Sequence, residues 1–168
     1  MRVPKRRGEE EARLKRTHDD YLTSEKIEAM ARRLLRLKQS ERPAAIAETQ
    51  QLAEMGDFSE NVGYQLAKAN LRRINDKIMS LEERLKTAIP IERGSPDGTV
   101  RIGSTVTVAC DGSERSYEIL GSSETDPIHG RISHLSPLGK ALLGHRAGDE
   151  VALPTLTGEK IYNLIHVE

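Results

Sequence analysis

Apolar residues recur at alternating spacings of three and four in two long stretches of the first half of the chain. Such spacing places them along one side of a helix, as in the seam of a coiled coil, and predicts two long helices. At 1.5 Å per residue, a first helix from Thr23 to Met55 is on the order of 45 to 50 Å long. The seam positions are Ile27, Met30, Leu34, Leu37, Glu41, Ala45, Thr49, Leu52 and Met55 in the first stretch, then Ala67, Leu71, Ile74, Ile78, Leu81, Leu85 and Ala88 in the second.

Proline and capping residues set the expected limits of these helices. Pro43 lies inside the first stretch, and because proline lacks an N–H and collides with the preceding turn, we expect a kink or a local shift of the seam. Residues 21–25, YLTSE, are typical of a helix start, with Thr23 or Ser24 as the N-cap. The second helix is expected to stop near Ala88, before Pro90.

From Thr99 the pattern changes to alternation of apolar and polar residues, which is typical of strands. Alternating runs on either side of an Asp111-Gly112 turn predict a hairpin, and residues 132–135, 150–153 and 160–167 predict further strands. Residues 137–143 begin with proline and are followed by glycine, which is typical of a short helix. We therefore predict an α+β protein whose second half is a small antiparallel sheet with one short helix.

These patterns divide the chain into four parts. The first eighteen residues mix both charges with almost no apolar periodicity, which predicts disorder. Proline, glycine and an Asp97-Gly98 turn signal mark a linker between the helices and the strands. The expected parts are a charged extension (1–18), an antiparallel helical hairpin (19–89), a linker (90–98) and a sheet domain (99–168).

Charge and cysteine content exclude several classes of protein. The 26 basic and 26 acidic residues cancel, so any contact with nucleic acid must come from a local patch. A single cysteine, Cys110, excludes a disulfide framework, and the five scattered histidines do not predict a metal site. The chain has no apolar run near 18 residues and no secretion signal behind Met1, so we expect a cytoplasmic protein that makes no membrane contact.

The segment GDFSEN, residues 56–61, places two carboxylates and a phenyl group between the two predicted helices. Asp57 and Glu60 have the spacing of a capping box, and this spacing alone favours capping over metal binding. Ser59 is an alternative cap that would free both acids. Two carboxylates suit Mg²⁺, yet they leave most of its octahedron to water, so they predict ligands delivered to a site that another molecule owns.

Several ordered blocks of the sequence resemble the bacterial Gre-family transcript cleavage factors, and the resemblance covers about residues 21–168. It implies an antiparallel coiled-coil hairpin that enters the secondary channel of RNA polymerase. It also implies an FKBP-like C-terminal domain that docks at the channel rim. The matching blocks are YLT (21–23), ERP (41–43), GDFSEN (56–61), Tyr64 and SPLGKALLG (136–144).

The same resemblance implies roles for particular residues. Asp57 and Glu60 would help the polymerase hold its second catalytic magnesium ion, so that backtracked RNA is cut and elongation resumes. The protein would then be a monomeric activator of the polymerase rather than an enzyme. Lys68 and Arg72 would contact the extruded RNA 3′ segment, although a solvated helix face is the alternative for both. Phe58 and Asn61 would contact polymerase or nucleotide at the tip.

Some features depart from the family pattern or leave alternatives open. Gly63 stands where these tips often carry another acid, and Asn61 resembles the A-type of factor whereas Tyr64-Gln65 resembles the B-type. One alternative function is a non-cleaving channel binder that inhibits or modulates the polymerase, against which both acids argue. A peptide-binding or prolyl-isomerase sheet domain would need more aromatic residues than Tyr117 and Tyr162. A purely structural coiled-coil adaptor does not account for the other ordered blocks.

Overall fold

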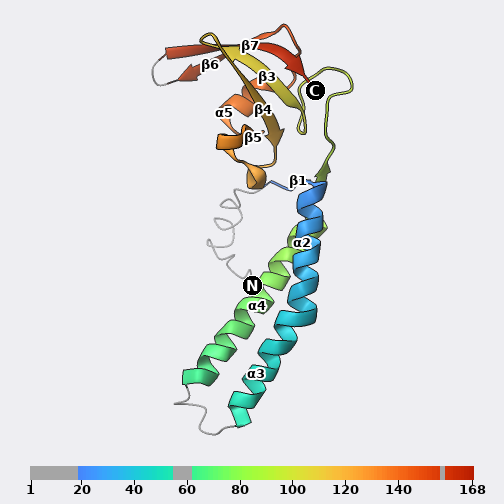
Figure 1. Cartoon of the computed structure of the whole chain (residues 1–168), viewed down its shortest axis with the longest axis vertical. Coiled ribbons are helices and arrows are strands. Elements are labelled where there is room, and N and C mark those ends of the chain that lie inside the picture. Colours follow the sequence, from blue (N-terminus) through green and yellow to red (C-terminus); the bar gives the residue numbers. More distant parts are fainter. Residues whose placement is uncertain (1–18, 55–61, 156–157) are drawn as a thin grey trace, which may run out of the picture. The chain divides into compact units, whose positions relative to one another are not determined.

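The computed structural model describes residues 19–54, 62–155 and 158–168. The chain forms two compact units. Residues 24–88 make a helical hairpin, and the segment that ends at Thr23 joins Ile89–Glu168 in a sheet domain (Figure 1). In the described part of the chain, no helix is long and apolar enough to cross a membrane.

The hairpin has the two predicted helical arms. The first arm consists of α2 (Ser24–Arg36), a π-helical turn (Leu37–Glu41) and α3 (Arg42–Glu54). The second arm is α4 (Val62–Thr87), which packs alongside α3 and α2 (Figure 1). α2 begins at Ser24, within the segment predicted to start the helix, whereas the predicted end at Met55 lies outside the described residues.

The irregularity predicted around Pro43 takes the form of the π-helical turn. Arg42 donates its backbone N–H to the carbonyl of Leu37, five residues earlier, instead of to the carbonyl four residues earlier. The proline two positions into α3 has no N–H to continue the regular ladder. The wider turn changes the helical phase while Leu37 and Ala45 remain 1% and 3% exposed, so the seam continues across the proline.

The predicted seam is the core of the hairpin. Its buried side chains lie along the seam positions, and most of the polar residues between these positions are exposed. Near the start of α4, which begins at Val62, the buried seam residue is Ala67, which is 5% exposed. The hairpin core consists of Leu37, Ala45, Ile74 and Ile78, with Leu34, Leu71 and Leu81 packed against it.

The sheet domain is a five-stranded sheet in the order β5-β4-β3-β7-β6 with one short helix. The β3–β4 hairpin turns at Asp111 and Gly112, whose φ angles of 52° and 75° match the predicted turn. The helix α5 (Pro137–Leu142) is capped by Ser136, whose hydroxyl accepts the Gly139 N–H at 3.0 Å. The strands are β3 (Thr105–Cys110), β4 (Ser113–Leu120), β5 (Arg131–Ser133), β6 (Glu150–Thr155) and β7 (Gly158–Val167).

The expectation of a wholly antiparallel sheet is wrong at one strand pair. β5 runs parallel to β4, with Glu118 opposite Arg131. The reason is the connection between the two strands, which contains two short 3-10 turns, Ser122–Glu124 and Pro127–His129. It brings the chain back beside Glu118, so that β5 starts there and runs in the same direction as β4. A tight turn after Leu120 would have reversed the chain instead.

A second sheet differs from the predicted division of the chain. β1 (Tyr21–Thr23) is a strand, although its sequence predicted the beginning of a helix, and it pairs in parallel with β2 (Ile89–Ile91). The hairpin unit is therefore shorter at both ends than the predicted range 19–89, and the predicted linker 90–98 begins inside β2. Three residues carry too little periodicity to separate a strand from a helix start.

The core of the sheet domain lies between the sheet and α5 (Figure 1). Val106 and Val108 point from β3 to the same face and are 0% and 1% exposed, as strand alternation requires. Leu142 of α5 and Ile119 of β4, both 0% exposed, complete the centre of this core. Close packing of this core holds the strands in place, and the strands in turn hold the ends of the loops that connect them.

Candidate functional site

The predicted tip lies between the two arms of the hairpin along the chain. α3 ends at Glu54 and α4 begins at Val62, so the GDFSEN segment joins the far ends of two packed helices. Asp57, Phe58, Glu60 and Asn61 lie outside the described residues. Their roles therefore stay predictions, while the helices that carry them are observed.

Lys68 and Arg72 lie together on one flank of α4, beside the seam rather than in it. They are four residues apart, a spacing that places both on the same helix face, and both are exposed. The Lys68 ammonium nitrogen lies 5.9 Å from the centre of the Tyr64 ring, within the range of a cation–π contact. Within residues 19–54, 62–155 and 158–168, no carboxylate forms an ion pair with either side chain.

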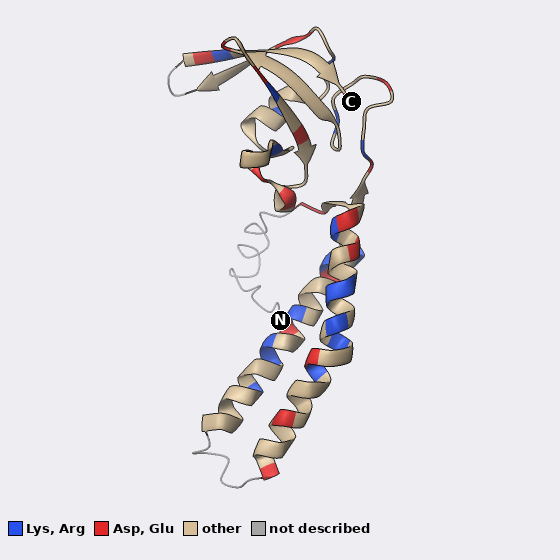
Figure 2. Ribbon diagram, in the orientation of Figure 1, with Lys and Arg blue, Asp and Glu red and all other residues tan. Residues whose placement is uncertain are grey.

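Basic and acidic residues are interspersed along the first arm (Figure 2), and several of them form ion pairs. Arg33 and Arg36 both contact the carboxylate of Glu41, and Lys38 pairs with Glu82 across the hairpin. The hydrogen bond from Lys38 lowers the pKa of Glu82 below its ordinary value. These charges are compensated within the hairpin, so the first arm is a weaker candidate for binding an anionic ligand.

Arg73 is exposed and makes a contact within its own helix. Its guanidinium donates to the Asn70 side-chain oxygen at 2.9 Å, one turn earlier, and it projects from a different flank than Arg72. Tyr64 is half-buried and lies three residues before the seam residue Ala67. The structure thus groups Lys68 with Arg72 and separates Arg73 from them.

Two apolar residues near the start of α4 were not identified from the sequence. Val62 and Leu66 are 70% and 66% exposed and lie four residues apart, so they share a helix face. The available signal was their register, because Leu66 comes directly before the seam residue Ala67 and cannot face the seam with it. They form an exposed apolar strip on the first two turns of α4, which directly follow the GDFSEN segment in the chain.

The sheet domain brings Tyr117 and Tyr162 to the same shallow depression, with Cys110 at its edge. Burial raises the pKa of Tyr162. The depression measures about 220 Å³, below the roughly 300 Å³ at which small-molecule pockets begin. Its rim is charged, with Lys160 and Asp111 paired at 3.1 Å. This geometry does not favour the peptide-binding alternative.

Among residues 19–54, 62–155 and 158–168, no group of three or more histidine, cysteine, aspartate or glutamate side chains is placed to hold a metal ion. The candidate magnesium ligands Asp57 and Glu60 lie outside these ranges.

Comparisons with known proteins cover both units. A family model described as "Transcription elongation factor, N-terminal" matches residues 20–89, and one described as "Transcription elongation factor, GreA/GreB, C-term" matches residues 95–168. The transcription elongation factor GreA of Thermomicrobium roseum is 40% identical over 150 residues, which span 88% of this chain and 96% of that protein. The GreA of Geobacillus kaustophilus is 36% identical over 151 residues, 88% of this chain and 95% of that protein.

Solved structures also match along most of the chain. GreA factor homolog 1 of Thermus thermophilus is 30% identical, with a TM-score of 0.41, and the match covers 89% of this chain and 99% of that one.

Proposed function

Because the chain belongs to the GreA/GreB family of transcription elongation factors, we propose that its helical hairpin enters the secondary channel of RNA polymerase. There it stimulates the polymerase's own cleavage of backtracked RNA. The observation that carries the proposal is a pair of acids, Asp57 and Glu60, in the segment that connects two helices packed along a continuous seam.

The carboxylates fit a magnesium ion as far as their chemistry is concerned. Mg²⁺ prefers hard oxygen donors, and two of them leave room for ligands from the polymerase. When bound, the metal supplies charge stabilisation at the phosphoryl group and lowers the pKa of water. In this proposal Asp57 and Glu60 add negative charge and oxygen donors to a site that the polymerase already owns, so the protein is an activator and not a nuclease by itself.

The second arm contributes to binding of the RNA. Lys68 and Arg72 project from one flank of α4, six and ten residues after the helix begins at Val62. Phosphates attract such cations without regard to base sequence, so we propose that both contact the extruded 3′ segment. Phe58 and Asn61 would contact polymerase or nucleotide at the tip. A third carboxylate contact is not proposed, because residue 63 is glycine.

The sheet domain is proposed to dock on the polymerase at the rim of the channel. Its buried cluster of eight apolar residues holds the loops on one sheet, which suits a docking role. Linking a weakly bound tip to a docked domain raises the local concentration of the acids at the active centre. We propose that the protein acts as a monomer in the cytoplasm.

The test is cleavage of 5′-labelled RNA in halted, backtracked elongation complexes, with and without the full chain. We expect faster release of short 3′ fragments by the parent protein, and little stimulation by a variant that combines Asp57→Asn and Glu60→Gln. Binding of both proteins to polymerase is measured in parallel. A parent protein that binds but does not stimulate cleavage would instead support the alternative, a channel binder that inhibits or modulates the enzyme.

A further inference from the structure

The strand β1 is short, yet it is held to the rest of the sheet domain by an unusual number of polar contacts. Among the described residues its strand partner is β2, in a parallel pair three residues long. Such a short pair is weak by itself. Thr23, the last residue of β1, directly precedes the first residue of α2, so the strand is the root of the first arm.

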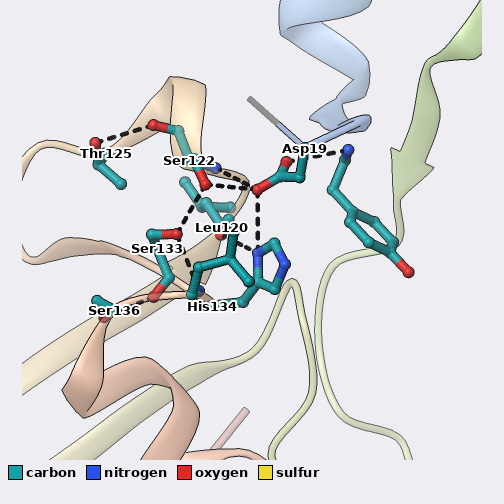
Figure 3. A network of polar contacts seen from close by, with 9 residues as sticks. Asp19, Leu120, Ser122, Thr125, Ser133, His134 and Ser136 are labelled. Carbon is teal, nitrogen blue, oxygen red and sulfur yellow. Dashed lines mark hydrogen bonds and ion pairs between the residues drawn. The ribbon is translucent and has the colours of Figure 1, made fainter. Parts of the chain in front are cut away.

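The first set of contacts surrounds Asp19 (Figure 3). Its carboxylate accepts the Ser122 backbone N–H at 2.9 Å and the Ser122 hydroxyl at 2.6 Å, and it also accepts the Tyr21 N–H at 3.2 Å. Hydrogen bonds to a charged acceptor are about twice as strong as neutral ones. Asp19 therefore ties the residues before β1 to a loop more than one hundred positions away.

His134 closes the same network from the other side. Its Nδ1 lies 3.2 Å from the Leu120 carbonyl oxygen and 3.5 Å from the Asp19 carboxylate, and because both are acceptors, Nδ1 carries the proton. Its ring meets the Tyr21 ring edge-on at 5.4 Å between centroids. Asp19 and His134 side chains are both only 11% exposed, so these contacts are shielded from water.

The second set of contacts lies at the other end of β1. Glu124 accepts the Thr23 backbone N–H at 2.8 Å and the Thr23 hydroxyl at 2.6 Å, one with each carboxylate oxygen. Thr23 is 5% exposed and Leu22 is 0% exposed. The last residue before the helical arm is thus held through both its backbone and its side chain.

Gly121 shows how closely β1 approaches the loop. A Cβ added there would lie 2.1 Å from the Tyr21 carbonyl oxygen and 2.8 Å from the Asp19 carboxylate. The φ of Gly121 is −67°, an ordinary value, so glycine is required for space and not for backbone conformation. The backbone of β1 therefore packs directly on the backbone of the loop.

We propose that Asp19 and Glu124 are positioning residues for transcript cleavage, because they hold the strand from which the first helical arm begins. For its effect on cleavage this inference rests on the proposed function. The first arm is about 45 Å long, so a change of about 5° in the direction of its root moves its far end by about 4 Å. Displacements of about 1 Å at a reacting centre can reduce rates by about 100-fold.

The test uses the full-length chain with Glu124→Ala, with Glu124→Gln as the conservative variant, and with Gly121→Ala as an independent steric wedge. Glu150→Ala, an exposed acid at the start of β6, is the matched control. We expect Glu124→Ala and Gly121→Ala to lower the cleavage rate at saturating protein by about 10-fold. Glutamine can accept the Thr23 N–H and donate to its hydroxyl, so Glu124→Gln should recover most of the rate.

A second measurement does not depend on polymerase. In a Cys110→Ser background, spin labels on Ala69→Cys and Arg115→Cys report the distribution of distances between α4 and β4, both sites being exposed. We expect Glu124→Ala and Gly121→Ala to broaden or shift this distribution relative to the parent, while Glu150→Ala leaves it unchanged. Melting of the sheet domain and polymerase binding are followed for every variant.

The outcomes separate the two proposals. An unchanged distance distribution and cleavage rate in Glu124→Ala and Gly121→Ala, with an active parent protein, overturn the positioning role and leave the proposed function intact. A loss of cleavage that follows the unfolded fraction in the melting curves also overturns it, because the contacts would then be only structural. A parent protein that stimulates no cleavage refutes the proposed function, whatever the distance distributions show.

Discussion

The helical hairpin and the sheet domain bury their apolar side chains in different ways. In the described part of the hairpin, the buried apolar residues follow a single narrow seam, and the segment that joins its arms carries acids. In the sheet domain, eight buried residues from several strands and α5 form one cluster. A narrow seam can extend a polar tip far from any core, whereas a compact cluster holds loops in place for docking. The difference agrees with the proposal that the hairpin carries the chemistry and the sheet domain the anchoring.

The largest effect is expected at the tip. Asp57→Asn and Glu60→Gln should each lower stimulated cleavage by about 100-fold or more, because each removes charge that stabilises the transition state at the metal. Binding to polymerase should stay close to that of the parent, since the seam and the sheet domain are unchanged. The measurements are single-turnover RNA cleavage and polymerase binding.

A capping role for the same acids makes a different prediction. If both variants lose activity only in proportion to lost helicity or lowered melting temperature, the carboxylates are helix caps and not catalytic ligands. Circular dichroism of the full chain distinguishes the two cases.

Core truncations in the two units test their division of roles. Ile78→Ala in the seam and Leu142→Ala in the sheet domain should each cost about 2 to 5 kcal/mol of unfolding free energy, because each leaves a cavity. We expect the Ile78 variant to lower the maximal cleavage rate, and the Leu142 variant to raise the concentration needed for half-maximal stimulation. Denaturant unfolding and cleavage titrations check this, and the reverse assignment would contradict separate roles.

A smaller effect is expected on the basic flank of α4. Replacing Lys68 and Arg72 with alanine should weaken cleavage several-fold in complexes with long extruded RNA, and less in complexes backtracked by a few nucleotides. Each lost phosphate contact should also lower the dependence of log affinity on log salt concentration by about 0.7. Arg73→Ala, on another flank, is the control. Equal defects on both substrates at every salt concentration would indicate an ordinary solvated face.

The smallest effect concerns the ion pair between the two arms. Because Lys38 lowers the pKa of Glu82, this contribution to stability is present above the unfolded-state pKa and is lost as pH falls through the folded-state pKa. Glu82→Gln should therefore melt slightly below the parent at neutral pH and together with it in acid. Melting curves at several pH values measure this, and a constant difference across the whole range would contradict it.

Local patterns determined much of this fold. The seam from Ile74 to Leu81 and the Asp111-Gly112 hairpin depend on neighbours within a few residues, which periodicity and turn chemistry describe well. Pro43 indicated an irregular helix for the same reason, although only the structure shows that it is a π-helical turn. The acids Asp57 and Glu60 were also identified from sequence, because chain order alone places them between two helices.

Contacts between distant residues were decided by the tertiary structure. The parallel pairing of β5 with β4 depends on the path of the ten-residue loop between them. The pattern of apolar and polar residues does not predict that path. Tyr21–Thr23 forms a strand because it pairs with β2 and because the Thr23 N–H donates to Glu124, although its sequence is equally typical of a helix start. The sequence by itself thus determined the two helical arms, most strands of the larger sheet and the position of the two acids between the arms. The tertiary structure decided which segments pair. Residues far apart in the sequence can form hydrogen bonds only when folding brings them together, and local patterns do not show which of them will meet.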